Sequence, residues 1–151
     1  MQSVISNNFV TRLAWFREIV GGQDLVLCNT SALECLGLFV GYLHENKIDV
    51  YAIEKGPYEN VNYHVVSNFN GIDLVRRDNL LCTSPAQTFN DMLSRYGTPE
   101  EIFVDERALV EGLCKYYLSN GNSFEGLYIS PRNIPYFENL KEWAIEFYDE
   151  D

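Results

Sequence analysis

Basic side chains are scarce in this sequence. Its 151 residues include 11 Lys and Arg against 22 Asp and Glu, which gives a formal net charge of −11, and the longest basic run is Arg76-Arg77. Because nonspecific binding to a phosphate backbone needs clustered Lys and Arg, direct DNA binding by this chain is not expected. The acidic balance leaves two interpretations open, which are simple solubility and a docking face for a basic partner.

Long apolar runs are lacking as well. No stretch approaches the roughly 18 apolar residues that a membrane-spanning helix needs. Residues 1–6 contain neither the basic segment nor the long apolar segment of a secretory signal. We therefore expect a cytoplasmic protein that does not contact a membrane.

Histidine and cysteine are few, and they are not spaced as metal ligands. The histidines are His44 and His64, and the sequence has no CxxC pair. We therefore expect no metal site and no cofactor, and we interpret the cysteines as buried free thiols of a reducing compartment. The four cysteines, each among apolar neighbours, are Cys28, Cys35, Cys82 and Cys114.

A catalytic constellation is also missing. Neither histidine is flanked by a nucleophile elbow such as GxSxG, so we interpret both as structural or solvated, and we predict no catalytic residue. One enzymatic alternative rests on Asp49 and Glu54-Lys55, which resemble the acid, acid and lysine pattern of metal-dependent nucleases. Adjacent Glu54 and Lys55 would point to opposite faces of a strand, so their spacing counts against this alternative.

What the sequence does contain is enough apolar surface for one folded domain. Hydrophobic residues make up 46% of the chain and aromatic residues 14%, and no linker-like stretch divides it. We expect a single domain over residues 1–151, with an acidic tail at residues 148–151.

Hydrophobic periodicity and turn signals predict helices at both ends of the chain around a central sheet. Asn29 or Thr30 is the expected cap of the second helix, Asn70-Gly71 is a hairpin signal, and Thr98 to Glu101 form a capping box. The predicted class is α+β, with a small mixed, partly antiparallel sheet packed with about five helices. Helices are expected at about 12–20, 31–36, 84–96, 98–118 and from 136 onward, and strands at 25–28, 48–53, 61–66 and 72–76.

The segment from Thr83 to Leu93 is the clearest single pattern. Ser84 followed by Pro85 is typical of a helix start, because the hydroxyl caps a free amide of the first turn and proline has no amide to leave unpaired there. Apolar residues then recur at helical spacing, while Thr88 and Asp91 fall on a different face.

This segment resembles the "TSPERTLLDL" signature of the AbiEi-type antitoxins, which are regulators of type IV abortive-infection systems. A second patch, from Thr30 to Leu38, is similar to the "SAAALHGL" helix that lies upstream in that family, and the resemblance extends over about residues 25 to 120. Gln87 and Leu36 depart from it, because the family usually has arginine and histidine there. The residues that match the signature, or that carry the upstream patch, are Ser31, Thr83, Ser84, Pro85, Thr88 and Asp91.

The resemblance implies a non-catalytic protein that neutralises a nucleotidyltransferase-like toxin or regulates through another protein partner, as in phage defence. In that family a preceding winged helix binds DNA, but only about 25 residues precede the first patch here, so we do not expect a transcriptional regulator that itself contacts DNA. Two alternatives stay open, which are a metal-dependent nuclease or nucleotide-processing enzyme that uses sheet carboxylates, and an acidic phage or mobile-element protein that mimics DNA.

The signature residues themselves have two interpretations. In one, Thr88 and Asp91 fix their helix against the preceding strand through hydrogen bonds, and Asp91 could pair with Arg95 one turn later. In the other, Asp91 contacts a toxin.

Overall fold

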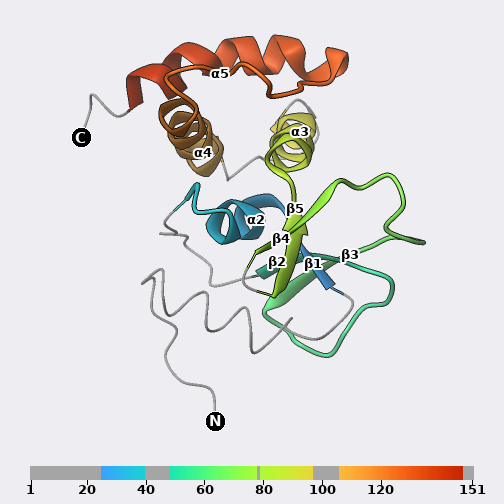
Figure 1. Ribbon diagram of the computed structural model, residues 1–151. Helices are drawn as coiled ribbons and strands as arrows, with labels where there is room; N and C mark the ends of the chain where they lie inside the picture. The colour runs from blue at the N-terminus through green and yellow to red at the C-terminus, as the bar shows by residue number, and fades with distance from the viewer. Residues whose placement is uncertain (1–24, 40–47, 78, 97–105, 148–151) are drawn as a thin grey trace.

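The computed structural model describes residues 25–39, 48–77, 79–96 and 106–147. Within them, Figure 1 shows a sheet, the helix α2 beside it, and the helices α3, α4 and α5 farther away on the same side. The predicted α+β class is therefore confirmed. The elements are β1 (Leu25–Leu27), α2 (Asn29–Cys35), β2 (Ile48–Ala52), β3 (Val61–Val65), β4 (Leu74–Arg77), β5 (Leu80–Thr83), α3 (Pro85–Tyr96), α4 (Glu106–Ser119), a 3-10 turn (Pro131–Asn133) and α5 (Ile134–Glu146).

The sheet is mixed, with five strands in the order β3-β2-β1-β5-β4. Strand β2 pairs antiparallel with β1 and parallel with β3, whereas β5 pairs parallel with β1 and antiparallel with β4. The predicted partly antiparallel, mixed sheet is therefore correct. The consecutive strands do not form a simple meander, because β2 and β3 run in the same direction and the connecting residues 53–60 return along the sheet.

The hairpin predicted at Asn70-Gly71 is also wrong. A local turn does form there, since the Ile72 amide donates to the Phe69 carbonyl at 3.2 Å and Gly71 has a φ of 83°. However, the strands on either side of this turn, β3 and β4, lie at opposite edges of the sheet. The chain instead reverses between β4 and β5, where Asn79 has a φ of 67°. A turn signal predicts a change of direction but not which strands pair.

The helix count also differs from the prediction. The described residues contain four α-helices and not about five, and the helix expected at 12–20 and the capping box at 98–101 lie outside them. The last helix begins at Ile134, two residues before its predicted start. Helix α2 is not capped by Asn29 or Thr30, because Cys28 takes the N-cap position without a side-chain cap bond.

The buried apolar residues form two clusters. One lies among the helices and includes Leu33 and Phe89, and the other joins the sheet to the inner side of α2. Gly112 of α4 permits a close approach in the first cluster, since a Cβ there would lie 3.1 Å from Leu33 and 3.3 Å from Phe89. All four cysteines are buried and outside any disulfide, as predicted. None of the described helices has the length and apolarity that a membrane crossing requires.

Candidate functional site

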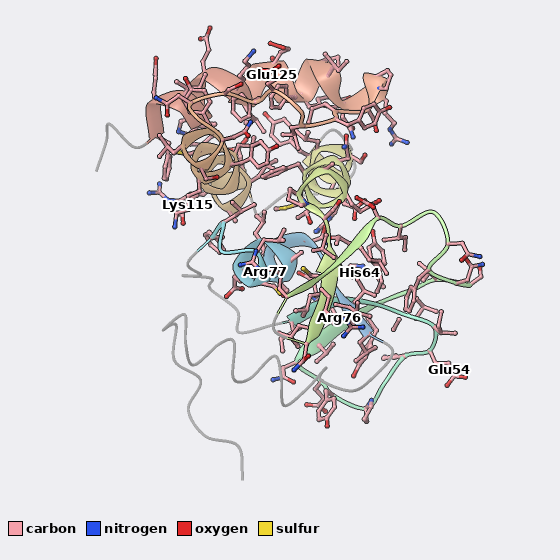
Figure 2. The ribbon with its side chains drawn as sticks, viewed as in Figure 1. Glu54, His64, Arg76, Arg77, Lys115 and Glu125 are labelled. Atoms are coloured by element: carbon pink, nitrogen blue, oxygen red, sulfur yellow. The ribbon has the colours of Figure 1, made fainter. Side chains whose placement is uncertain are left out.

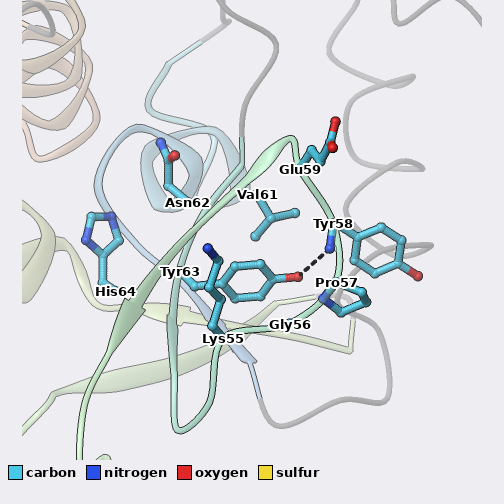
Figure 3. Close-up of a pocket in the computed structure, with 9 residues that line it drawn as sticks. All are labelled: Lys55, Gly56, Pro57, Tyr58, Glu59, Val61, Asn62, Tyr63 and His64. Carbon is cyan, nitrogen blue, oxygen red and sulfur yellow. Dashed lines mark hydrogen bonds between the residues drawn. The ribbon is translucent and has the colours of Figure 1, made fainter.

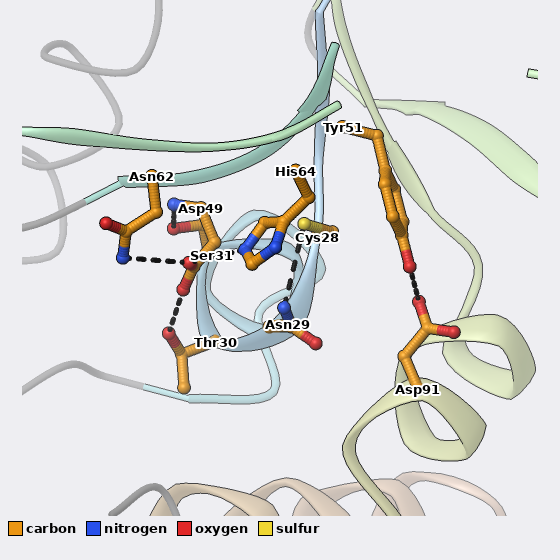
Figure 4. A network of polar contacts seen from close by, with 9 residues as sticks. All are labelled: Cys28, Asn29, Thr30, Ser31, Asp49, Tyr51, Asn62, His64 and Asp91. Carbon is orange, nitrogen blue, oxygen red and sulfur yellow. Dashed lines mark hydrogen bonds and ion pairs between the residues drawn. The ribbon is translucent and has the colours of Figure 1, made fainter. Parts of the chain in front are cut away.

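The two patches that resemble the antitoxin family meet at one strand. Ser31 of α2 accepts a hydrogen bond from the Asp49 amide, with its Oγ 2.9 Å from that nitrogen. Asp91 of α3 accepts one from the Tyr51 hydroxyl, with the two oxygens 2.8 Å apart. Asp49 and Tyr51 are both residues of β2, so residues far apart in the sequence attach two helices to the same short strand (Figure 4).

Side chains of β2 and β3 make one side of the sheet polar. In the parallel register Asp49 lies beside Asn62, and Tyr51 lies beside His64. Because side chains alternate along a strand, these four residues share one face, which we call the polar face. The residues between them on β2, such as Val50, belong to the apolar cluster on the opposite side.

Asp49 is the centre of this polar face. Asp49 is only 8% exposed. Its carboxylate accepts hydrogen bonds from Asn62 Nδ2 at 3.1 Å and from Thr30 Oγ1 at 3.5 Å. His64 Nε2 lies 3.1 Å from the same carboxylate, and 39% of the His64 side chain is exposed. The Tyr51 ring meets the imidazole edge-on, with 6.1 Å between centroids. This arrangement holds the imidazole in one orientation with part of the ring accessible from solvent.

The hydrogen bond between Tyr51 and Asp91 connects the polar face to α3. Burial raises the pKa of Asp91, against the lowering effect of the hydrogen bonds that it accepts from Tyr51 and Gln87. Burial and the neighbouring Asp91 carboxylate raise the pKa of the Tyr51 hydroxyl far above its usual value. The phenol therefore keeps its proton and acts as the donor across this contact.

Gln87, one of the two residues that depart from the resembled signature, has a defined role here. Its Nε2 donates to Asp91 at 2.9 Å, and its Oε1 accepts from the Asp73 amide at 3.0 Å. It thereby connects α3 with the segment that leads into β4. The sequence predicts neither the two Gln87 contacts nor the hydrogen bond from Tyr51 to Asp91, since the contacts with Asp73 and Tyr51 depend on strand order that no local pattern specifies.

The remaining signature residues build the start of α3. Ser84 Oγ accepts from the Gln87 amide at 3.1 Å, which confirms the predicted cap. Thr88 Oγ1 lies 2.6 Å from Thr83 Oγ1 and donates to the Ser84 carbonyl at 2.7 Å. Thr83 and Thr88 are fully buried, as is Ser31, and Ser84 is 5% exposed. A partner of the folded domain would therefore meet Pro85 and Asp91, which are half-buried, before the other signature residues.

Asn29 shows an unusual backbone at the start of α2. Its φ is 50°, a left-handed value that asparagine tolerates better than most residues. Its Nδ2 lies 3.8 Å from the sulfur of Cys28, whose thiol pKa is raised by burial. Its Oδ1 is buried without a hydrogen-bond partner among the described residues. The Cys28 thiol stays neutral in this environment and is not activated as a nucleophile.

The residues of the nuclease alternative do not come together. Asp49 is buried among donors of its own chain, whereas Glu54 is exposed in the loop after β2 (Figure 2). In the part of the chain that the structure describes, no group of three or more His, Cys, Asp or Glu side chains is placed to hold a metal ion.

A pocket of about 670 Å³ lies beside β3 (Figure 3). The Tyr63 hydroxyl projects over the preceding loop and accepts from the Tyr58 amide at 3.3 Å. Gly56 lies beneath it, and a Cβ there would lie 2.5 Å from the Tyr63 oxygen, so a larger residue would displace the Tyr63 ring. Aromatic, imidazole and amide groups line the pocket together with one lysine and one glutamate, and the residues are Lys55, Gly56, Pro57, Tyr58, Glu59, Val61, Asn62, Tyr63 and His64.

The buried Asp91 carboxyl predicts a pH effect. Because its pKa is higher in the folded than in the unfolded state, it contributes stability that is complete below the unfolded value of about 3.9 and is lost as the pH rises through the folded value. We therefore expect the wild-type protein to lose stability relative to Asp91→Asn as the pH increases. Urea unfolding of both proteins between about pH 3.5 and 7.5 measures this difference. The opposite trend would show that the hydrogen bonds from Tyr51 and Gln87 outweigh burial.

The comparisons with known proteins found no related sequence or structure. No family model, no curated protein and no solved structure matches the chain. The resemblance to AbiEi-type antitoxins therefore stays a prediction from the two sequence patches.

Proposed function

We propose that this protein acts by binding a protein partner, as a domain similar to that of the AbiEi-type antitoxins. The observation that carries the proposal is the attachment of both family-like patches to β2, through Ser31 and Asp49 and through Asp91 and Tyr51. Two short patches that match a family by chance have no reason to lie at the same strand. Their meeting at β2 supports a shared structural role for the two patches.

The charge of the chain supports a basic partner surface. With a formal net charge of −11, the protein attracts positively charged proteins and repels both nucleic acid and a second copy of itself. The partner that the resemblance implies is a nucleotidyltransferase-like toxin of the cytoplasm. In this function the chain neutralises the toxin by occupying part of its surface and performs no catalysis of its own.

Co-expression tests this proposal directly. The chain is produced together with the protein encoded by the adjacent open reading frame, and growth and co-purification are measured. We expect the chain to restore growth and to elute with the partner as a complex that weakens as salt is raised. If growth is not restored and no partner elutes with the chain, the proposed function is wrong.

A matched pair of variants locates the contact. His64→Ala changes the exposed part of the polar face, and Glu138→Gln changes an exposed residue of α5 on the helical layer. If the partner sits on the polar face, the first variant weakens co-purification and the second does not.

A further inference from the structure

The two edges of the sheet are protected to different degrees. Edge strand β4 ends in Arg76 and Arg77, both exposed (Figure 2), and charged side chains of this kind are a common defence against unwanted strand pairing. Edge strand β3 has the sequence Val-Asn-Tyr-His-Val, which contains no charged residue, proline or glycine. Within the described residues no strand pairs with its outer side.

The backbone of β3 has groups directed toward this open side. The Ile48 amide donates to the Asn60 carbonyl, and the Val66 amide donates to the Ala52 carbonyl. These two bonds show that the even-numbered residues beside β2 direct their backbone groups toward it. Along a parallel strand, the backbone groups of every second residue bond to the same neighbouring strand. The N–H and C=O groups of Asn62 and His64 therefore face β2. The N–H and C=O groups of Tyr63 and Val65 therefore point away from the sheet.

Apolar side chains gather around the same edge. Val65 is 57% exposed at the end of β3, and Ile53 and Tyr58 in the connection before β3 are 43% and 40% exposed. The pocket formed by residues 55–59 and β3 lies beside them. An added strand would cover apolar surface here as well as satisfy backbone groups.

We propose that the open edge of β3 binds an extended, basic segment of a protein partner, which adds to the sheet as a sixth strand. The inference rests on the proposed function and names the mode of partner binding. Main-chain hydrogen bonds to Tyr63 and Val65 supply affinity, and alternate side chains supply specificity. The exposed charged residues beside this edge are two carboxylates, Glu54 and Glu59, and one lysine, Lys55, and the whole chain has a formal net charge of −11. This acidic balance favours a basic segment and disfavours a second copy.

A synthetic peptide tests the edge without the natural partner. The probe has alternating valine and Lys or Arg, with blocked ends, and the control peptide has glutamate at every basic position. We expect the basic peptide to slow amide exchange of Tyr63 and Val65 about tenfold or more at saturation, with little change for the Arg76 and Arg77 amides. Equal binding of both peptides, or protection of β4 and not β3, would overturn the proposal.

Variants at Val65 separate edge pairing from other contacts. Val65→Pro removes an outward N–H, and Val65→Lys keeps it but places a positive charge at the edge, so both should weaken peptide binding by about tenfold or more. Val65→Thr keeps the N–H and the strand propensity and should bind within about twofold. If the proline variant does not fold, the peptide affinity of the lysine variant tests the proposal. Unchanged affinity of Val65→Lys contradicts strand addition.

The outcomes of this test and of the co-expression test are distinguishable. Peptide binding at β3 without any toxin complex would contradict the antitoxin function and leave edge binding intact. A toxin complex that forms normally with Val65→Lys and leaves the Tyr63 amide unprotected would contradict edge binding alone. Sedimentation of the free protein tests the remaining possibility, which is that a second copy of the chain binds this edge. A dimer that Val65→Lys dissociates would show that the edge binds a second copy and not a basic segment.

Discussion

Replacing Phe89 with alanine is expected to lower the free energy of unfolding by about 3–5 kcal/mol. The Phe89 ring is fully buried in the helical cluster, and it meets the Tyr116 ring edge-on with 6.0 Å between centroids. It also lies against Gly112, so its removal leaves a cavity where α3, α4 and α2 meet. A small domain is typically stable by about 5–15 kcal/mol, so this loss is a large share of the total.

Chemical denaturation at neutral pH measures this effect, with two controls. Phe89→Leu keeps most of the apolar volume and should cost clearly less than the alanine variant. Leu118→Ala removes a side chain of α4 that is 40% exposed, and it should change stability by about 1 kcal/mol or less. A loss below about 1 kcal/mol for Phe89→Ala would contradict the packing of α3 described above.

Replacing Asn90 with alanine is expected to cost about 2–4 kcal/mol, because several hydrogen bonds lose their partner together. Asn90 Nδ2 donates to the Tyr128 carbonyl at 2.9 Å, and its Oδ1 accepts from the Ser130 amide at 2.8 Å. The same oxygen accepts from Asn133, a residue that is 1% exposed. Asn90 thus fastens the segment before α5 to α3.

Asn90→Asp and Asn139→Ala are the controls for this prediction. The aspartate keeps the acceptor and loses the donor, so it should cost an intermediate amount. Asn139 is exposed on α5, and its alanine variant should change stability by about 0.5 kcal/mol or less. If Asn90→Ala is as stable as the wild type, the segment at residues 128–133 is not held by these hydrogen bonds.

Features of α3 that depend on neighbours in the sequence were predicted correctly, although the cap expected at α2 from Asn29 or Thr30 was wrong. Ser84 caps α3 because its hydroxyl and the Gln87 amide belong to the same turn, and the apolar residues Phe89, Met92 and Leu93 face the core because they repeat at helical spacing. The mixed α+β character followed from the alternation of such local elements. Burial of the cysteines followed from their apolar neighbours.

Features that depend on strand order were not predictable. The Asn70-Gly71 turn was recognised, but the strands on either side of it belong to opposite edges of the sheet. The sequence alone gives Asp49 as a candidate nuclease acid and His64 as a structural or solvated histidine, and only the parallel pairing of β2 with β3 brings them together. No local pattern encodes that pairing, because the energy that selects it comes from packing the whole sheet against α2.

The sequence by itself determined where α3 starts, that its apolar stripe and the four cysteines are buried, and that the chain is strongly acidic with its basic residues mostly dispersed. These properties arise from single residues and from periodicity within one element. Only the tertiary structure decided that the Ser31 and Asp91 patches meet at β2 and that Gln87 joins α3 to the segment before β4. It also decided that β3 is an edge strand, with no strand paired to its outer side among the residues that the structure describes. Each of these is a relation between elements, fixed by the strand order that buries the most apolar surface while pairing the backbone.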